Sequence, residues 1–412
     1  MDGKREARVL IYSHDTFGLG HLRRCRAIAH ALVGQNRNLS VLILSGSPII
    51  GNFDFRARVD FVRVPGVIKL RNGEYTSLAL HIDVEKTLAI RSSIVQHTAE
   101  AFDPDLFIVD KEPLGLRGEV GETLAMLKKR GTPLVLGLRD VLDDPEALGR
   151  EWRRKNVLPA LRDLYDEIWI YGVPEMCDPL AGAGLSRAIR DKVRYTGYLR
   201  RGLPAEMPAW SPPDKIDAPY ILVTTGGGGD GQEMIDWVLS AYEADAGLPH
   251  PALIVLGPFM ATEIQAGFLE RCAALPRVEA ITFDAHMEGL MARSVGVVAM
   301  GGYNTFCEIL SFDKPALIVP RTVPRLEQFI RASRAQELGL VRMLGDDGTR
   351  EPLEMARALR ELGNQPRPSL AMAPGLLDGL ESMNRLADRL LRGRPAAMAA
   401  GGSGGATAAG AV

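Results

Sequence analysis

The sequence predicts an α/β protein of two domains, each built on one doubly wound parallel sheet. Its 412 residues exceed the roughly 250 to 300 residues at which a single hydrophobic core stops growing. Short β-branched runs alternate with longer helical patterns along the chain, which is typical of βαβ units. The alternation restarts after a proline-rich segment, so the two halves are expected to form separate sheets that face a cleft.

Seven short apolar runs in the first half, residues 1–203, are expected strands. They cover residues 8–12, 39–44, 61–64, 106–109, 134–138, 167–170 and 193–196. Helical patterns lie between them at residues 22–33, 84–101 and 118–129. Because strands and helices alternate, this half is predicted to form the first sheet.

The second domain is expected at residues 220–374, after a linker at 204–219 whose prolines disfavour regular structure. Its expected strands are 220–224, 252–256, 278–281, 295–299 and 316–319. An amphipathic pattern at 375–392 predicts a last helix, and in two-domain proteins of this kind such a return helix often folds back across the cleft. The tail, 393–412, is rich in glycine and alanine and is expected to be disordered.

The composition is typical of a globular protein with small-molecule partners. Apolar residues make up 46% and charged residues 24% of the chain, close to globular averages, which argues against disorder. With 49 Lys+Arg and 51 Asp+Glu, no overall positive field favours nucleic acid. The four cysteines form no CxxC pair, so neither a zinc site nor a disulfide framework is predicted. Without a signal-like N-terminus or an apolar stretch of roughly 18 residues, we expect a cytoplasmic protein, with peripheral membrane contact left open.

A glycine turn follows the first expected strand, in the segment SHDTFGLGHLRRC that begins at Ser13. Gly18 and Gly20 lie in this turn, and His21 opens the next helix. Glycines let the backbone approach a ligand closely, and a helix start favours an anion. The third glycine of a dinucleotide-binding GxGxxG pattern is replaced by Arg23, so NAD binding is not predicted.

Several polar residues near this turn are candidates for chemistry. His21 would be the general base that deprotonates an acceptor hydroxyl or water, and His14 is the second candidate. The alternative for each is a histidine satisfied by the surrounding backbone. Asp110 and Arg139 close two later strands at the sheet edge where ligands bind, so they are candidate acceptor contacts, or else residues of solvated turns.

Four consecutive glycines follow the first strand of the second half. They are Gly226, Gly227, Gly228 and Gly229. A glycine run after a first strand and before a helix predicts a phosphate cradle, and the alternative is a mobile loop.

The stretch 295–339 carries the most specific pattern in the chain. A glycine pair follows a strand and precedes a helix with a glutamate, and then come a KP turn, a strand ending in VP and a polar pair that opens another helix. These features are Gly301, Gly302, Asn304, Thr305, Glu308, Lys314, Pro315, Pro320, Glu327 and Gln328. The pattern resembles the C-terminal domain of glycosyltransferase family 28, typified by the lipid II GlcNAc transferase. This resemblance implies the GT-B fold, with two Rossmann-like domains facing a cleft.

The resemblance also implies how a nucleotide-sugar donor is bound. Glu308 would accept hydrogen bonds from the ribose diol. Gly302, Asn304 and Thr305 would hold the diphosphate at a helix start, and Gly301 belongs to the same turn.

The sugar and the nucleobase of the donor would be recognised by residues on either side of this helix. The resemblance implies that Glu327 and Gln328 contact the sugar hydroxyls. It also implies that the nucleobase lies beside a phenylalanine one strand earlier, at Phe283 and Asp284.

The string GHLRRC departs from the lipid II transferase type, which has proline where this chain has Arg24. This string is more similar to the hydrolase that cleaves a UDP-sugar in pseudaminic acid synthesis. Hydrolysis therefore remains an alternative, although the additional helix at 84–101 favours a full acceptor domain.

No metal site is predicted. Asp103 and Asp105 match a DxD pattern but precede a strand, whereas a metal-binding pair would follow one. The charge of the departing diphosphate must then be met by helix starts and cations, and Arg321 is the best candidate.

These features predict a metal-independent glycosyltransferase that moves a sugar from a nucleotide-diphosphate donor, expected to be a UDP-sugar, to a hydroxyl of a carbohydrate or lipid-linked acceptor. Inversion at the anomeric carbon is implied only by the resemblance. The nucleotide sugar is a substrate, so no cofactor is expected. The alternatives are a nucleotide-sugar hydrolase or epimerase on the same fold, and a non-catalytic nucleotide-sugar-binding protein.

Overall fold

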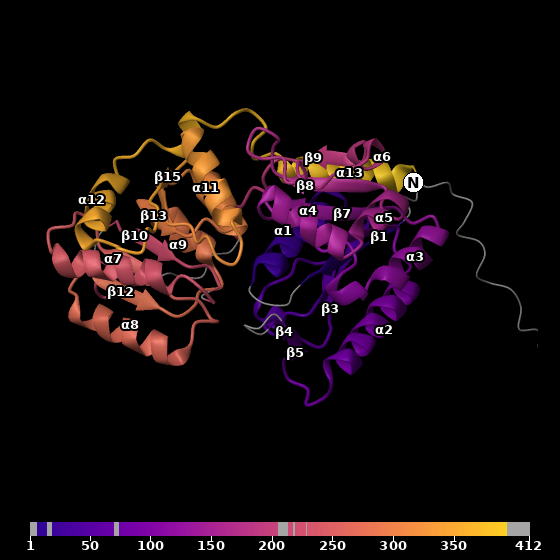
Figure 1. Ribbon diagram of the computed structural model, residues 1–412, viewed down its shortest axis with the longest axis horizontal. Coiled ribbons are helices and arrows are strands. Elements are labelled where there is room, and N and C mark those ends of the chain that lie inside the picture. The colour runs from indigo at the N-terminus through magenta and orange to yellow at the C-terminus, as the bar shows by residue number, and fades with distance from the viewer. Residues whose placement is uncertain are drawn as a thin grey trace, which may run out of the picture.

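The computed structural model describes residues 6–14, 19–69, 74–204, 213–216, 219–227 and 229–393. Figure 1 shows two α/β units that lie side by side. Gly18, Gly228 and residues 394–412 of the expected tail lie outside the described residues, as do residues 205–212 and 217–218 of the expected linker.

The N-terminal half contains a seven-stranded sheet in which all neighbouring strands are parallel. The strand order is β3-β2-β1-β6-β7-β8-β9. The strands are β1 (Ala7–Ser13), β2 (Leu39–Ser45), β3 (Val59–Arg63), β6 (Leu106–Asp110), β7 (Leu134–Arg139), β8 (Glu167–Tyr171) and β9 (Val193–Tyr195). All seven expected strands are confirmed, because a parallel sheet covered by helices needs strands that are apolar on both faces.

The C-terminal half contains a six-stranded parallel sheet with the order β12-β11-β10-β13-β14-β15. Its strands are β10 (Ile221–Thr224), β11 (Ala252–Val255), β12 (Val278–Ile281), β13 (Gly296–Ala299), β14 (Ala316–Ile318) and β15 (Arg342–Met343). Three strands escaped the sequence analysis: β15 and the antiparallel hairpin β4 (Val67–Lys69) and β5 (Tyr75–Ser77). Each is too short to show a periodic pattern.

Helices cover the faces of both sheets (Figure 1). In the N-terminal half they are α1 (Gly20–Gln35), α2 (Val84–Phe102), α3 (Gly121–Lys129), α4 (Pro145–Arg154), α5 (Val157–Asp163) and α6 (Arg187–Arg190). Those that follow are α7 (Gln232–Ala244), α8 (Thr262–Ala274), α9 (Met287–Arg293), α10 (Tyr303–Ser311), α11 (Glu327–Glu337), α12 (Pro352–Leu362) and α13 (Gly379–Arg392). Helix α3 begins later than expected, because Leu116–Gly118 forms a separate short 3-10 turn in which Arg117 has a left-handed φ of 48°.

The chain passes between the halves twice, and the two passages lie together. Leu199 in the first passage forms an antiparallel bridge with Asp378 in the second. The amide of Tyr198 donates to the carbonyl of Leu376 at 2.7 Å. Helix α13 then packs against α1 and β6, and Figure 1 shows it lying on the N-terminal half. The last helix of the chain therefore belongs to the surface of the N-terminal half.

No helix in the described ranges combines the length and the apolar character needed to cross a lipid bilayer.

Candidate active site

Each sheet has one point at which the strand order reverses. In the N-terminal sheet β1 lies between β2 and β6, and in the C-terminal sheet β10 lies between β11 and β13. Open parallel sheets bind ligands at the carboxyl ends of the strands that flank such a point. The segments after β1, β6, β10 and β13 are therefore the places to look for a site.

The segments after β1, β10 and β13 line one cavity of about 520 Å³, a volume typical of ligand pockets. From the N-terminal half the cavity is lined by Gly20, His21, Arg23, Arg24, Phe53 and Arg139. From the C-terminal half its lining includes Gly226, Gly227, Gly229, Phe283, Asp284, Gly302, Asn304, Thr305, Glu308, Arg321 and Gln328. The structure thus brings most of the predicted site residues to one place.

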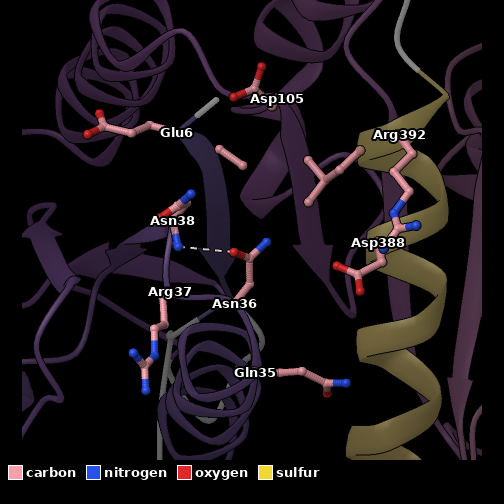
Figure 2. Close-up of a pocket in the computed structure, with 10 residues that line it drawn as sticks. Glu6, Gln35, Asn36, Arg37, Asn38, Asp105, Asp388 and Arg392 are labelled. Carbon is pink, nitrogen blue, oxygen red and sulfur yellow. Dashed lines mark hydrogen bonds between the residues drawn. The ribbon is translucent and has the colours of Figure 1, made fainter. Parts of the chain in front are cut away.

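A larger cavity of about 870 Å³ lies elsewhere (Figure 2). It is lined by Ala7, Asn36, Asp105 and Arg392, among others. Ala7 begins β1 and Asp105 directly precedes β6, so this cavity lies at the amino edge of the sheet, opposite the edge where ligands bind. We therefore assign the site to the smaller cavity.

His21, in the first turn of α1, is paired with Asp110 at the end of β6. The distance between His21 Nδ1 and Asp110 Oδ2 is 2.5 Å. Arg24 donates to the same carboxylate from Nε at 2.8 Å and from Nη2 at 2.7 Å. Both carboxylate oxygens are engaged and Asp110 is only 1% exposed. Asp110 therefore lies behind His21, not at the acceptor position expected from the sequence.

The electrostatics of this pair determine which nitrogen of His21 carries the proton. Burial lowers the pKa of His21 to about 4, although Asp110 acts in the opposite direction. Burial alone would raise the pKa of Asp110, but Arg24 and His21 hold it well below its usual range. Arg24 Nη2, a donor, also lies 3.0 Å from Nδ1, but the closest partner of Nδ1 is the Asp110 carboxylate at 2.5 Å. Because an ionised carboxylate can only accept, we assign the proton to Nδ1 of His21. Nε2 is then unprotonated, which is the state a general base requires.

His14, the second candidate base, lies behind His21 and does not line the cavity. The centroids of the two imidazole rings are 5.7 Å apart. His14 Nδ1 is 3.4 Å from the hydroxyl of Tyr12, which donates to Glu119 at 2.5 Å. Burial lowers the pKa of His14 well below its ordinary value. A neutral, buried His14 supports the ring of His21 from behind.

Two helices begin at the cavity, α1 after Leu19 and α10 after Gly302. The positive ends of both helix dipoles therefore favour an anion there. Gly301 shapes the second turn: its φ is 81°, and a Cβ would lie 2.8 Å from Ile318, so glycine is required. Its carbonyl accepts from Arg331 at 2.8 Å, and Gly301 itself does not line the cavity.

Glu308 and Asn304 line the cavity, but their polar atoms contact the N-terminal half. Arg23 Nη2 donates to Glu308 Oε1 at 2.5 Å. Asn304 donates from Nδ2 to the carbonyl of Gly20 at 2.9 Å and accepts from Arg201 at 2.9 Å. Both predicted donor-binding side chains therefore form part of the contact between the halves.

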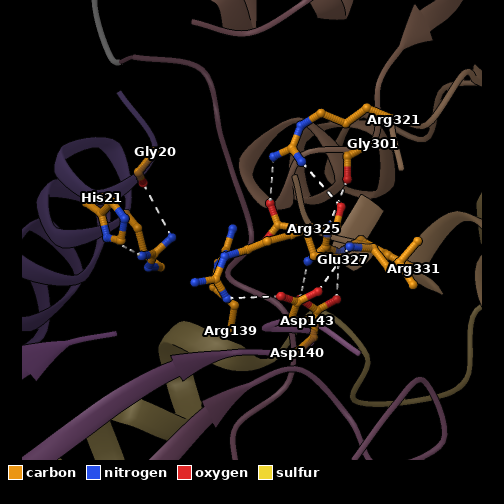
Figure 3. A network of polar contacts seen from close by, with 12 residues as sticks. Gly20, His21, Arg139, Asp140, Asp143, Gly301, Arg321, Arg325, Glu327 and Arg331 are labelled. Carbon is orange, nitrogen blue, oxygen red and sulfur yellow. Dashed lines mark hydrogen bonds and ion pairs between the residues drawn. The ribbon is translucent and has the colours of Figure 1, made fainter. Parts of the chain in front are cut away.

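Glu327 does not line the cavity, whereas its neighbour Gln328 does. Its carboxylate pairs with Arg139 from the N-terminal half and with Arg321, the latter at 3.2 Å (Figure 3). Burial opposes ionisation, but the arginines lower the pKa of Glu327 to about 2. This geometry differs from the implied contact with sugar hydroxyls: Glu327 positions two arginines at the cavity edge.

Phe283 and Asp284 line the cavity where the resemblance implies a nucleobase. Asp284 Oδ1 accepts from the amide of His286 at 2.6 Å. Phe283 packs in a cluster with Leu19 and Phe53 of the other half. Sequence analysis missed Phe53, because it follows a short irregular turn without a periodic pattern.

A buried ion pair joins the halves beside the cavity (Figure 3). Arg331 of α11 donates to both carboxylate oxygens of Asp140 at 2.7 and 2.6 Å, and neither side chain is exposed by more than 1%. Arg325 also pairs with Asp143 at 3.3 Å. These contacts could not be found from the sequence, because they depend on how two separate sheets face each other.

The comparisons with known proteins agree with this architecture. Residues 221–388 match the glycosyltransferase family 28 C-terminal domain. No curated protein sequence matches the chain. Among solved structures, the calicheamicin glycosyltransferase CalG4 is similar with a TM-score of 0.60 and 16% identity, over 94% of this chain and 99% of that one.

Two further structures are similar over both halves. A UGT transferase from Siraitia grosvenorii in complex with UDP has a TM-score of 0.61 and 15% identity, covering 93% of this chain and 100% of that one. MurG from Acinetobacter baumannii has a TM-score of 0.54 and 12% identity, covering 93% and 99%. The predicted fold is confirmed: the chain has the two-domain GT-B fold, and residues 221–388 match the glycosyltransferase family 28 C-terminal domain.

Proposed function

We propose that this protein transfers a sugar from a nucleoside diphosphate donor to a hydroxyl of a carbohydrate or lipid-linked acceptor. One observation carries the proposal: the His21–Asp110 pair of one half and the start of α10 in the other half meet at a single cavity. Displacement at an anomeric carbon needs a base on the side of the acceptor and positive charge on the side of the leaving diphosphate.

The residues divide the chemistry between the two halves. Nε2 of His21 takes the proton of the acceptor hydroxyl while the oxygen of that hydroxyl bonds to the anomeric carbon of the donor sugar. The bond from that carbon to the diphosphate oxygen breaks, and the configuration inverts. Asp110 stabilises the resulting imidazolium. The start of α10 and Arg321 meet the charge of the departing diphosphate, so the proposed reaction needs no metal.

A UDP-sugar is the proposed donor. The support is the family 28 domain at residues 221–388 and the UDP in the Siraitia grosvenorii structure. A further structural neighbour, VinC, is in complex with dTDP, so thymidine nucleotides belong in the same assays.

Hydrolysis is the second candidate function. It is favoured by the geometry of Arg24, the residue that distinguishes the GHLRRC string. Arg24 binds the carboxylate that orients His21, and the same pair could activate water as readily as an acceptor hydroxyl.

The test is to incubate the purified protein with UDP- and dTDP-sugars, with and without a cell extract as the source of acceptors, and to measure the free nucleoside diphosphate. The variant His21→Ala with the same extract is the control for release by other enzymes. Release that needs the extract supports transfer.

The other outcomes reject the proposal in different ways. Equal release in buffer alone supports hydrolysis. Conversion of the sugar without release supports an epimerase. Binding of a nucleotide sugar without any conversion supports a non-catalytic binding protein.

A further inference from the structure

Helices α1 and α10 face each other across the cavity with two matched contacts. The carbonyl of Gly20 accepts from Asn304 at 2.9 Å, and one turn along both helices Arg23 donates to Glu308 at 2.5 Å. Both helices begin at the cavity. The Gly20–Asn304 contact is therefore nearer to the two positive helix ends than the Arg23–Glu308 contact. Arg23 therefore lies about one helical turn, roughly 5.4 Å, from the predicted diphosphate position.

Arg23 is shared between two carboxylates of the C-terminal half. Its Nη2 lies 2.5 Å from Glu308 and 3.3 Å from Glu288 of α9. The Glu308 side chain is 2% exposed, and the other two side chains are 17% exposed. Burial raises the pKa of Glu308, although Arg23 acts in the opposite direction. Arg23 thus contacts two acids, with Arg201 as a further cation near both, and one of the acids is the residue that would bind the ribose.

None of the other described arginines that line the cavity pairs with a predicted donor-binding carboxylate that itself lines the cavity. Arg24 binds Asp110, which orients the base. Arg321 belongs to the C-terminal half. Arg139 pairs with Glu327, which does not line the cavity. Among the described lining residues, Arg23 is the arginine whose partner, Glu308, is itself a lining residue predicted to bind the donor. When the donor binds, its ribose hydroxyls would replace Arg23 on the Glu308 carboxylate.

From these contacts we infer that Arg23 is a donor-binding residue supplied by the N-terminal half. The ribose hydroxyls take its place on Glu308, and the guanidinium moves toward the α10 start, where it donates to the diphosphate. An arginine is suited to this exchange because its planar donors match carboxylate and phosphate oxygens alike. The inference rests on the proposed donor site. It adds that one side chain of the N-terminal half contacts the diphosphate that the C-terminal half binds.

The inference predicts opposite effects on two ligands. A nucleoside must compete with Arg23 for the Glu308 carboxylate. Because it has no phosphate, it makes no favourable contact with the displaced guanidinium. A nucleoside diphosphate also competes for Glu308, but its phosphates then accept hydrogen bonds from the displaced Arg23 guanidinium. Arg23→Gln should therefore tighten nucleoside binding and weaken diphosphate binding.

The experiment measures the affinities of uridine and UDP, which both carry the ribose diol, for the full chain by titration calorimetry and ligand-observed NMR. For Arg23→Gln we expect a several-fold gain for the nucleoside and a loss of at least about tenfold for the diphosphate, the lower end for a hydrogen bond to a charged group. The matched control is Arg37→Gln, an exposed arginine just beyond the far end of the same helix, which should change neither affinity.

Affinities that move in the same direction for both ligands, or that do not move, would overturn the role of Arg23. If Arg23→Gln does not fold, Arg23→Lys is used: it should keep the nucleoside affinity and weaken the diphosphate, because lysine keeps the charge without the planar fork. Equal loss of both ligands in Arg23→Lys would overturn the inference. If the unaltered protein binds neither a nucleoside nor a diphosphate, the proposed donor site itself is rejected.

Discussion

Replacing Asp110 with asparagine tests how His21 is prepared for catalysis. The substitution keeps the shape of the side chain and removes its charge. Asp110 binds His21 at 2.5 Å and Arg24 at 2.7 and 2.8 Å. An amide has a single acceptor oxygen, which Arg24 would occupy, so the amide nitrogen would face the imidazole. His21 Nδ1 would then have to accept, the proton would move to Nε2, and the base would be lost.

The expected loss of turnover follows from this change of tautomer. A positioned general base contributes about 10² to 10⁴-fold, and the equivalent Asp→Asn change in a Ser-His-Asp triad lowers turnover by about 10⁴-fold. Asp110→Asn should therefore raise the barrier by about 3 to 5 kcal/mol. Arg24, whose side chain is 2% exposed, would also keep a buried charge without a carboxylate, which costs about 3 to 5 kcal/mol of unfolding free energy.

The assay is turnover at saturating donor and acceptor, together with UDP affinity by calorimetry and the midpoint of urea unfolding. Asp105→Asn is the matched control, because Asp105 directly precedes β6 and is also buried but lies at the opposite edge of the sheet. It should lower stability and leave turnover per folded molecule unchanged.

Two results would refute the reasoning about Asp110. One is a folded Asp110→Asn protein with turnover close to that of the unaltered protein, which would show that Asp110 does not select the tautomer. The other is a fall in UDP affinity as large as the fall in turnover, which would place Asp110 in the donor site.

The remaining predictions concern His21 and Glu308. His21→Ala should lower turnover by about 10² to 10⁴-fold and leave UDP affinity nearly unchanged; preserved turnover would show a structural role. Glu308→Gln should weaken UDP by about 1.5 to 3 kcal/mol, measured by calorimetry, and an unchanged affinity would contradict the ribose assignment. Because the pKa of His21 is about 4, kcat/KM should be steady from neutral pH to about pH 5 and fall as His21 protonates, whereas a fall centred near pH 6.5 would contradict it. In the unfolded chain His21 binds its proton near pH 6.5. The unfolding free energy should therefore decrease as the pH falls from about 6.5 to 4, because the unfolded state then binds more protons; urea unfolding across that window measures it.

Much of the fold could be predicted because buried parallel strands are apolar along their whole length. The ends of β1, β6, β10 and β13 are marked in the sequence by polar or glycine residues, which is why His21 and Gly302 were recognised as candidates. The strands that escaped prediction have only two or three residues, such as β15. So short a segment shows neither the helical nor the strand periodicity of apolar residues.

The contacts within the site could not be predicted from the same patterns. The pairing of His21 with Asp110 requires β1 and β6 to be neighbours, and the sequence does not state the strand order. The pairing of Arg23 with Glu308 joins residues 285 positions apart and depends on the orientation of two separately formed sheets. Sequence alone therefore indicated which residues lie at the cleft, but not that several of them bind one another.

The two adjacent passages of the chain between the halves restrict how the cleft can move. A Cβ on Gly379 would lie 2.5 Å from the carbonyl oxygen of Gly197, and a Cβ on Gly197 would lie 2.8 Å from that of Gly375, so the passages touch backbone to backbone. A single connection would let the halves twist freely, whereas two connections in contact resist torsion and permit mainly bending about one axis. His21 and the start of α10 would then return to the same alignment after each opening, and that alignment depends on glycines that never contact a substrate.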